Sequence, residues 1–122
     1  MNKIVVTLML LSSSVMASET KCMTEIMYSE AQGEPITGLI AVGEATLNRA
    51  DNQNKSVCKI TGVTRKAVPS KLKPHYTALA NGIISNKDRT IGKADSWDRS
   101  KRPRYAKKII ARIGNHTFYK SG

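Results

Sequence analysis

The chain has 122 residues, with 20 Lys and Arg against 9 Asp and Glu, and a formal net charge of +11. This length allows one domain, and the charge indicates attraction to a polyanion such as nucleic acid, an anionic membrane surface or an acidic cell-envelope polymer. A solvated basic surface without a specific partner is the alternative. The few Cys and His residues show no metal-ligand spacing, so we expect no metal site and no cofactor.

Residues 1–17 have the three parts of a secretory signal peptide: a charged start, an apolar run over 4–11, and small residues at Val15 and Ala17. The apolar run is shorter than the roughly 20 residues that span a bilayer. A buried N-terminal helix is the alternative. We predict cleavage after Ala17, a secreted or periplasmic location, and a mature domain over 18–122 with 19 basic residues, 9 acidic residues and a net charge of +10. Export argues against nucleic acid as the partner and favours anionic cell-envelope polymers.

The mature domain begins with a predicted helix. Apolar residues recur there at helical spacing: Met23, Ile26, Met27 and Ala31. Gly33 ends this helix, and Pro35 suits the first turn of the next. We predict a second helix over 36–50, whose wide apolar face makes it central and buried. A third helix is predicted over 74–86, and the basic stretch 59–73 is predicted to be loop with a short strand.

The C-terminal sequence predicts a β-hairpin. Two apolar runs flank Gly114-Asn115, a two-residue turn signal. The predicted register pairs Ile113 with His116 and Ala111 with Phe118. A helix through 104–113 is the competing interpretation. The pattern as a whole predicts a small α+β domain that is mainly helical and ends in the hairpin.

Cys22 and Cys58 are the two cysteines of the chain. In an oxidising compartment they most simply form one disulfide bond, which would stabilise a small domain by roughly 3–4 kcal/mol. Two free buried thiols are the alternative.

Glu30 carries the first indication of chemistry. It lies four residues after Ile26 and three after Met27, so it shares the apolar face of the first helix. A carboxyl group among apolar side chains holds its proton to higher pH, as a general acid requires. The alternative is a buried glutamate paired with an arginine. Glu34 follows beyond Gly33, so we expect it near the start of the second helix rather than in a catalytic pair.

Three further acids have weaker indications. Glu44 lies in the apolar second helix, and we expect a salt bridge for it. Asp95 and Asp98 flank Trp97. Such a group suits sugar binding, because apolar sugar faces stack on aromatic rings while carboxylates bind hydroxyl groups.

Three stretches of the sequence are MYSEAQGEPITGLIAVGEATLNRA, DRTIGKADSW and IGNHTFY, in this order. Together they resemble the SleB-like family of spore-cortex-lytic cell wall hydrolases. MYSEAQGEPITGLIAVGEATLNRA resembles the opening motif, which typically reads E-A-R-G-E-P and continues into an apolar helix ending in L-N-R. DRTIGKADSW resembles the middle segment, and IGNHTFY resembles the closing I-G-N-H-x-F-Y. The resemblance covers about Cys22 to Tyr119. Asn48 and Arg49 match L-N-R, and we expect structural roles for both.

The resemblance implies a lysozyme-like fold and a peptidoglycan partner. It implies an enzyme that cleaves the glycan strand between N-acetylmuramic acid and N-acetylglucosamine, with Glu30 as the catalytic acid. A lytic transglycosylase uses one glutamate as acid and then as base, so it needs no second carboxylate as nucleophile, unlike most glycosidases. Muramidase hydrolysis is the other outcome, and own-wall remodelling and an endolysin role both stay open.

Substrate contacts are assigned to five residues: Gln32, Asp95, Trp97, His116 and Tyr119. Gln32 stands where arginine is common in the family, and 59–73 lacks the usual aromatic Q-F-x-W-like stretch. His116 has a hydrogen-bonded structural role as its alternative. A catalytically inactive, cationic peptidoglycan-binding module and a cationic secreted protein that disrupts membranes or binds nucleic acid are the competing functions. We expect a monomer.

Overall fold

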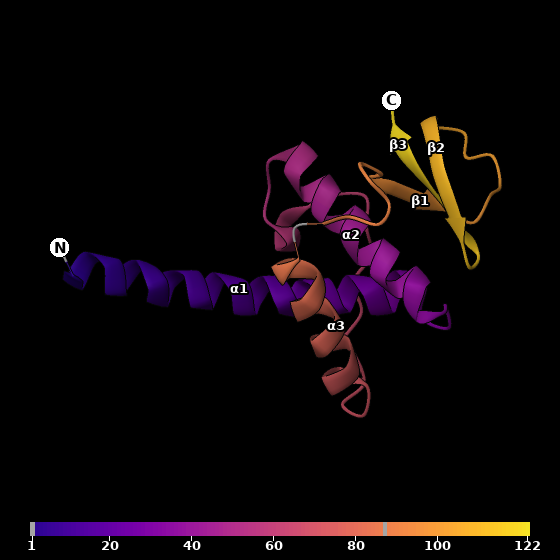
Figure 1. Ribbon diagram of the computed structural model, residues 1–122. Coiled ribbons are helices and arrows are strands. Elements are labelled where there is room, and N and C mark those ends of the chain that lie inside the picture. The colour runs from indigo at the N-terminus through magenta and orange to yellow at the C-terminus, as the bar shows by residue number, and fades with distance from the viewer. Residues whose placement is uncertain (1, 87) are drawn as a thin grey trace.

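The computed structural model describes residues 2–86 and 88–122, with side chains from residue 16 onward apart from residue 87. Figure 1 shows the elements of this part of the chain in order: α1 (Asn2–Ala31), α2 (Ile36–Gln53), the 3-10 helix η1 (Val57–Lys59), α3 (Lys73–Ser85), β1 (Ser96–Asp98), β2 (Ala106–Ile113) and β3 (His116–Ser121). The predicted α+β, mainly helical class is confirmed.

Helix α2 is the centre of the domain, as its wide apolar face predicted. It contacts both other helices and all three strands. Gly43 permits a close approach to α3, because a Cβ atom there would lie 2.6 Å from Cδ1 of Ile83. The helix continues to Gln53, beyond the predicted end. Asn54 ends it in the left-handed conformation, with a φ of 53°.

Helix α1 contributes fully buried side chains to the hydrophobic core. Met23, Ile26 and Met27 have no exposed surface, and α1 contacts both α2 and α3. The N-terminal half of α1 extends past the other elements in Figure 1. The predicted signal peptide, 1–17, lies mostly outside the residues whose side chains are described, so its cleavage stays a prediction. Among the described residues, no helix combines the length and the hydropathy needed to cross a membrane.

The irregular segment 60–69 lies along α1. Lys66 N donates a hydrogen bond to Glu25 O at 3.4 Å, and Val68 is buried. The short strand predicted within 59–73 is wrong, because these residues contain no strand and their long-range hydrogen bonds go to α1 and α2 rather than to a neighbouring strand.

The three strands form one antiparallel sheet in the order β1-β3-β2. The hairpin register is as predicted: Ile113 is opposite His116, and Ala111 is opposite Phe118. The competing C-terminal helix is therefore wrong. Strand β1 was not predicted, and it pairs with the other edge of β3, where Trp97 is opposite Phe118.

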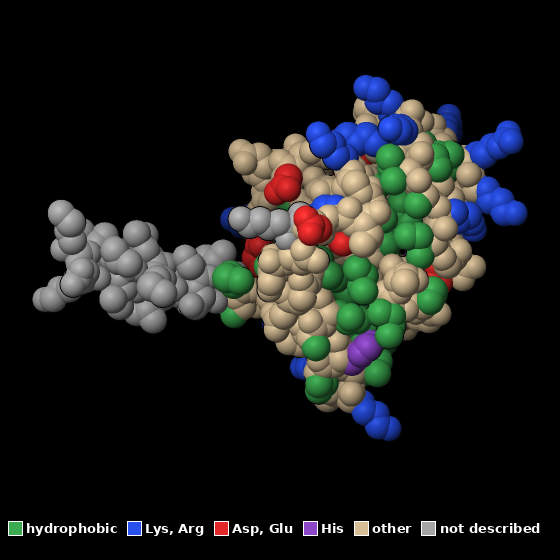
Figure 2. Space-filling view, viewed as in Figure 1, with side chains coloured by type: hydrophobic (Ala, Val, Ile, Leu, Met, Phe, Trp, Pro, Cys, Tyr) green, Lys and Arg blue, Asp and Glu red, His purple; other side chains and the backbone are tan. Residues whose placement is uncertain are grey.

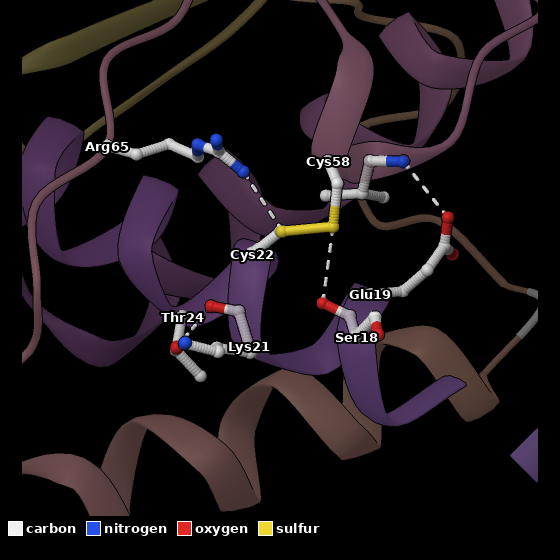
Figure 3. The surroundings of a disulfide bond; sticks show 8 residues. Ser18, Glu19, Lys21, Cys22, Thr24, Cys58 and Arg65 are labelled. Carbon is white, nitrogen blue, oxygen red and sulfur yellow. Dashed lines mark hydrogen bonds between the residues drawn. A yellow bond between two sulfur atoms is a disulfide. The ribbon is translucent and has the colours of Figure 1, made fainter. Parts of the chain in front are cut away.

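The predicted disulfide bond joins Cys22 of α1 to Cys58 of η1 (Figure 3). Arg65 Nη1 donates a hydrogen bond to Sγ of Cys22 at 3.0 Å. One turn earlier in α1, Glu19 Oε1 accepts a hydrogen bond from Val57 N at 3.0 Å. The bond and its surroundings therefore fix α1 to the segment that follows α2.

Candidate active site

Glu30 is the penultimate residue of α1. Met27, three residues earlier, is fully buried, whereas Glu30 is half-buried. The expected apolar surroundings of Glu30 are wrong. The helix ends directly after it, so its carboxylate lies at the margin of the core and lines an open, polar cleft.

Two distant segments hold the Glu30 carboxylate. Trp97 Nε1 donates a hydrogen bond to Oε2 at 3.0 Å. Thr64 donates two hydrogen bonds to Oε1, from its hydroxyl at 2.7 Å and from its backbone N at 3.3 Å. Ser29 Oγ lies 2.7 Å from Thr64 Oγ1, within hydrogen-bond distance. The carboxylate is therefore oriented from two sides, by β1 and by the irregular segment.

The cleft around this carboxylate has a volume of about 310 Å³. Its lining residues come from α1, from the end of β1 with the residue after it, and from the start of β3: Ser29, Glu30, Trp97, Asp98, Arg99 and His116. The structure thus brings together Glu30, Trp97 and His116 from the predicted set. Asp98, which the sequence marked as one of two acids flanking Trp97, also lines the cleft, whereas Arg99, Ser29 and Thr64 were not assigned to the site from sequence.

Arg49 of α2 links the two segments that hold the Glu30 carboxylate, β1 and the irregular segment 60–69. Its guanidinium carbon lies 4.8 Å from the centroid of the Trp97 ring, a cation–π distance. Arg49 Nε donates to Asp95 O at 2.9 Å, and Nη1 donates to Gly62 O at 2.7 Å. One side chain therefore ties the start of β1 to the irregular segment. These contacts agree with the structural role expected for Arg49.

Asn48, its neighbour in the L-N-R match, has the same kind of role. Its Nδ2 donates hydrogen bonds to Gly92 O at 3.0 Å and to Ala94 O at 2.8 Å. Both acceptors precede β1, so Asn48 fixes the path of the chain into this strand.

Asp95 lies away from the cleft, in an internal network. Its carboxylate is buried and accepts hydrogen bonds from Asn52 Nδ2 at 2.8 Å and from Ser121 N and Oγ at 2.9 Å. Burial alone would raise the pKa of Asp95, but the hydrogen bonds from Ser121 and Asn52 and the charge of Lys120 outweigh it and lower the pKa to about 2. These contacts hold β1 against the end of β3.

Glu34 and His116 form a second buried pair beside the cleft. Glu34 accepts hydrogen bonds from Asn115 N at 2.7 Å and Asn115 Nδ2 at 3.0 Å, and its Oε1 lies 3.1 Å from His116 Nδ1. Burial raises the pKa of Glu34, but the Asn115 hydrogen bonds and the charges of His116 and Arg99 outweigh it and lower the pKa.

For His116 the balance runs the other way. Burial lowers its pKa, and the nearby Glu34 carboxylate offsets only part of the effect. His116 Nδ1 is buried and has no hydrogen-bond partner of good geometry among the described residues, although Glu34 Oε1 lies 3.1 Å away. The Glu34–Asn115 contacts attach the hairpin turn to the start of α2, and this attachment places His116 at the cleft.

Gln32 and Tyr119 complete the predicted set, and neither lines the cleft. Gln32 is exposed in the turn after α1. Tyr119 is buried in β3 opposite Ser96 and Ile109.

A larger cavity, about 460 Å³, lies between α1, the irregular segment and α3. Thr24, Val68 and Thr77 are among its lining residues. The smaller cleft is the candidate active site, because a positioned carboxylate and an aromatic ring meet there. Within the residues that the structure describes, no three His, Cys, Asp or Glu side chains are placed to hold a metal ion.

Two solved structures share this fold. The catalytic domain of the germination-specific lytic transglycosylase SleB from Bacillus anthracis superimposes with a TM-score of 0.63 and 20% identity, over 84% of this chain and 93% of that domain. The chain has the SleB catalytic-domain fold. The catalytic domain of the Bacillus cereus SleB protein gives a TM-score of 0.65 and 21% identity, over 84% of this chain and 89% of that domain. No protein-family model and no curated protein matches the sequence.

Proposed function

We propose that the chain cleaves the glycan strand of peptidoglycan between N-acetylmuramic acid and N-acetylglucosamine, as a lytic transglycosylase in which Glu30 is the general acid and base. The observation that carries this proposal is the open cleft in which Trp97 and Thr64 orient the Glu30 carboxylate. The SleB-like fold supports it, because one of the two similar domains is a lytic transglycosylase. The E-A-Q-G-E-P match places Glu30 at the first glutamate of the motif.

The proposed reaction has two proton transfers through one carboxyl group. Glu30 protonates the glycosidic oxygen of the leaving N-acetylglucosamine as its bond to C1 of N-acetylmuramic acid breaks. The Glu30 carboxylate then removes the proton from the 6-hydroxyl of the same muramic acid residue. That oxygen bonds to C1 and closes a 1,6-anhydro ring, so no water is consumed and Glu30 regains its proton.

The contacts of Glu30 fit both stages. A hydroxyl group both donates and accepts hydrogen bonds, so Thr64 can donate to the carboxylate and can accept from the protonated acid. The Trp97 indole can only donate a hydrogen bond, and it donates to Oε2. When Glu30 is protonated, its proton therefore does not point at the indole, and lies on Oε1 or points into the cleft. The Trp97 ring, backed by Arg49, offers an apolar surface beside the reacting bond. The proposal includes export, a peptidoglycan partner and a monomeric chain.

Digestion of purified peptidoglycan in ¹⁸O-labelled water tests the reaction type. We expect soluble anhydromuramyl products without ¹⁸O, measured by mass spectrometry. Reducing-end products that carry ¹⁸O would replace transglycosylation by hydrolysis. Asp98, which lines the cleft, would then be the carboxylate to test as the group that activates water.

A catalytically inactive peptidoglycan-binding module of the same fold is the second candidate function. The observation that favours it is that both oxygens of Glu30 already accept hydrogen bonds. Retained binding to peptidoglycan with no released product would establish this alternative.

A further inference from the structure

Positive charge is concentrated at the C-terminal end of the sequence. Residues 99–122 contain eight Lys and Arg and no Asp or Glu. This stretch therefore supplies +8 of the net charge of +11, and the preceding 98 residues are nearly balanced, with 12 basic against 9 acidic side chains. The excess belongs to one part of the fold rather than to the whole surface.

In the structure this stretch forms the connection from β1 to β2, followed by the hairpin. Lys and Arg side chains gather along the upper and right-hand edges of Figure 2, over the end of the molecule that the sheet forms in Figure 1. We use the term basic face for six exposed residues of the connection and of the start of β2: Arg99, Lys101, Arg102, Arg104, Lys107 and Lys108.

The charges of the basic face are not neutralised within the described part of the chain. There, the ion pair of Lys120 with Asp95 and the contact of His116 with Glu34, which is charged only when His116 is protonated, both lie outside the basic face. Clustered like charges repel one another, which destabilises the folded state. Tyr105, in the middle of the cluster, is 72% exposed. Unpaired cations around an exposed aromatic side chain are the composition of a binding surface for an anionic partner.

The basic face is continuous with the cleft. Arg99 belongs to both, since it lines the cleft together with Glu30 and Asp98. Arg112 Nη1 donates hydrogen bonds to Arg99 O at 3.1 Å and to Thr117 Oγ1 at 2.7 Å. These bonds fix the start of the connection against the hairpin. A polymer held at Glu30 would therefore have the basic face directly beside it.

We propose that the basic face binds the carboxylates of the peptide chains attached to the glycan strand, and so holds peptidoglycan beside the cleft. This inference rests on the proposed function, because it takes the strand in the cleft to be peptidoglycan. The peptides are attached to N-acetylmuramic acid, so their carboxylates lie along the same strand that the cleft receives. Phosphate-bearing wall polymers are the other envelope anion, and the treatments described below distinguish them from the peptide carboxylates.

Binding to insoluble peptidoglycan tests the inference without any need for cleavage. In a Glu30→Gln background, we would replace Lys101, Arg102 and Arg104 together by glutamine. The matched control in the same background replaces three exposed lysines outside the basic face by glutamine: Lys55, Lys71 and Lys93. At low ionic strength we expect the first triple variant to bind roughly tenfold more weakly and the control to change less than about twofold.

Chemical modification of the peptidoglycan shows whether the basic face binds carboxylates or phosphates. Conversion of its carboxyl groups to neutral amides should remove the difference between the two triple variants, and removal of phosphate polymers should leave it. Equal binding of the two variants would overturn the inference, as would a difference that survives amidation and disappears with the phosphate polymers. Failure of the proposed function would be seen separately, as absence of cleavage products from the wild-type chain that still binds through the basic face.

Discussion

Replacement of Asp95 by asparagine tests the network that holds β1, and with it Trp97, in place. The Asp95 carboxylate accepts hydrogen bonds from Ser121 N at 2.9 Å and Asn52 Nδ2 at 2.8 Å. Burial raises its pKa, but these bonds and Lys120 lower the pKa from 3.8 to about 2. One pKa unit corresponds to about 1.4 kcal/mol, so the ionised carboxylate stabilises the folded domain by roughly 2.5 kcal/mol at neutral pH.

The sign of the pH dependence follows from the lowered pKa. The stabilisation is present above about pH 4, where Asp95 is ionised in the unfolded chain too, and it is lost as the pH falls toward 2. The difference in free energy of unfolding between wild type and Asp95→Asn should therefore be about 2.5 kcal/mol or more at pH 7. It should shrink by about 1 kcal/mol at pH 3 and by about 2 kcal/mol at pH 2.

Urea unfolding followed by circular dichroism measures this difference. Asp51→Asn, at an exposed carboxylate of α2, is the control and should change the free energy of unfolding by less than about 0.5 kcal/mol. Other carboxyl groups titrate alike in wild type and variant and cancel in the comparison. A difference that stays constant from pH 7 to pH 3 would refute the reasoning about Asp95.

Three further changes test other parts of the account. Trp97→Phe removes the indole donor to the proposed catalytic carboxylate, and we expect activity on peptidoglycan to fall roughly 10- to 100-fold with an unchanged circular dichroism spectrum; full activity would contradict the role of the indole. Gly114→Ala puts a Cβ atom 2.8 Å from Glu34 Oε1 at a φ of 59°, so the Tm should fall by roughly 5–10 °C, and an unchanged Tm would contradict the proposed turn contact. Replacing Cys22 and Cys58 together by serine should lower the free energy of unfolding by about 3–4 kcal/mol in urea titrations, and no loss would show that the bond does not form in solution.

Local patterns in the sequence were enough to predict most of the fold. Helical periodicity gave α2 and α3 within a few residues, and Gly114-Asn115 gave the register of the hairpin. Strand β1 could not be predicted in this way, because three residues are too few for a period. It forms through pairing with β3, about 20 residues later in the chain, and pairing at such a distance leaves no local pattern.

The candidate site was predictable only in part. The helical face of Glu30 and the nearby aromatic residue pointed to this region, but the environment of Glu30 depends on where α1 ends. Thr64 contacts Glu30 from an irregular segment 34 residues away, and nothing in the local sequence marks it.

Asp95 and Glu44 also show that local sequence does not reveal tertiary hydrogen bonds. The sequence could not distinguish Asp95 from Asp98, since both flank Trp97 and only the tertiary hydrogen bonds place Asp95 in the interior. Among the residues that the structure describes, the contacts of Glu44 are hydrogen bonds rather than the expected salt bridge. Its carboxylate is buried and accepts hydrogen bonds from Thr90 N at 3.0 Å and Thr90 Oγ1 at 2.6 Å. Neutral donors 46 residues away satisfy this group, and helix periodicity carries no information about them.

The most direct test of the central claim is the release of soluble glycan fragments from purified peptidoglycan by wild type, by Glu30→Gln and by Glu25→Gln. Glu25 lies on the same helix and outside the cleft, so its variant controls for the loss of one carboxylate. We predict anhydromuramyl products from wild type and from Glu25→Gln, and a loss of at least about 100-fold in Glu30→Gln. Wild-type activity in a folded Glu30→Gln variant would contradict the assignment of Glu30 as the catalytic acid and base.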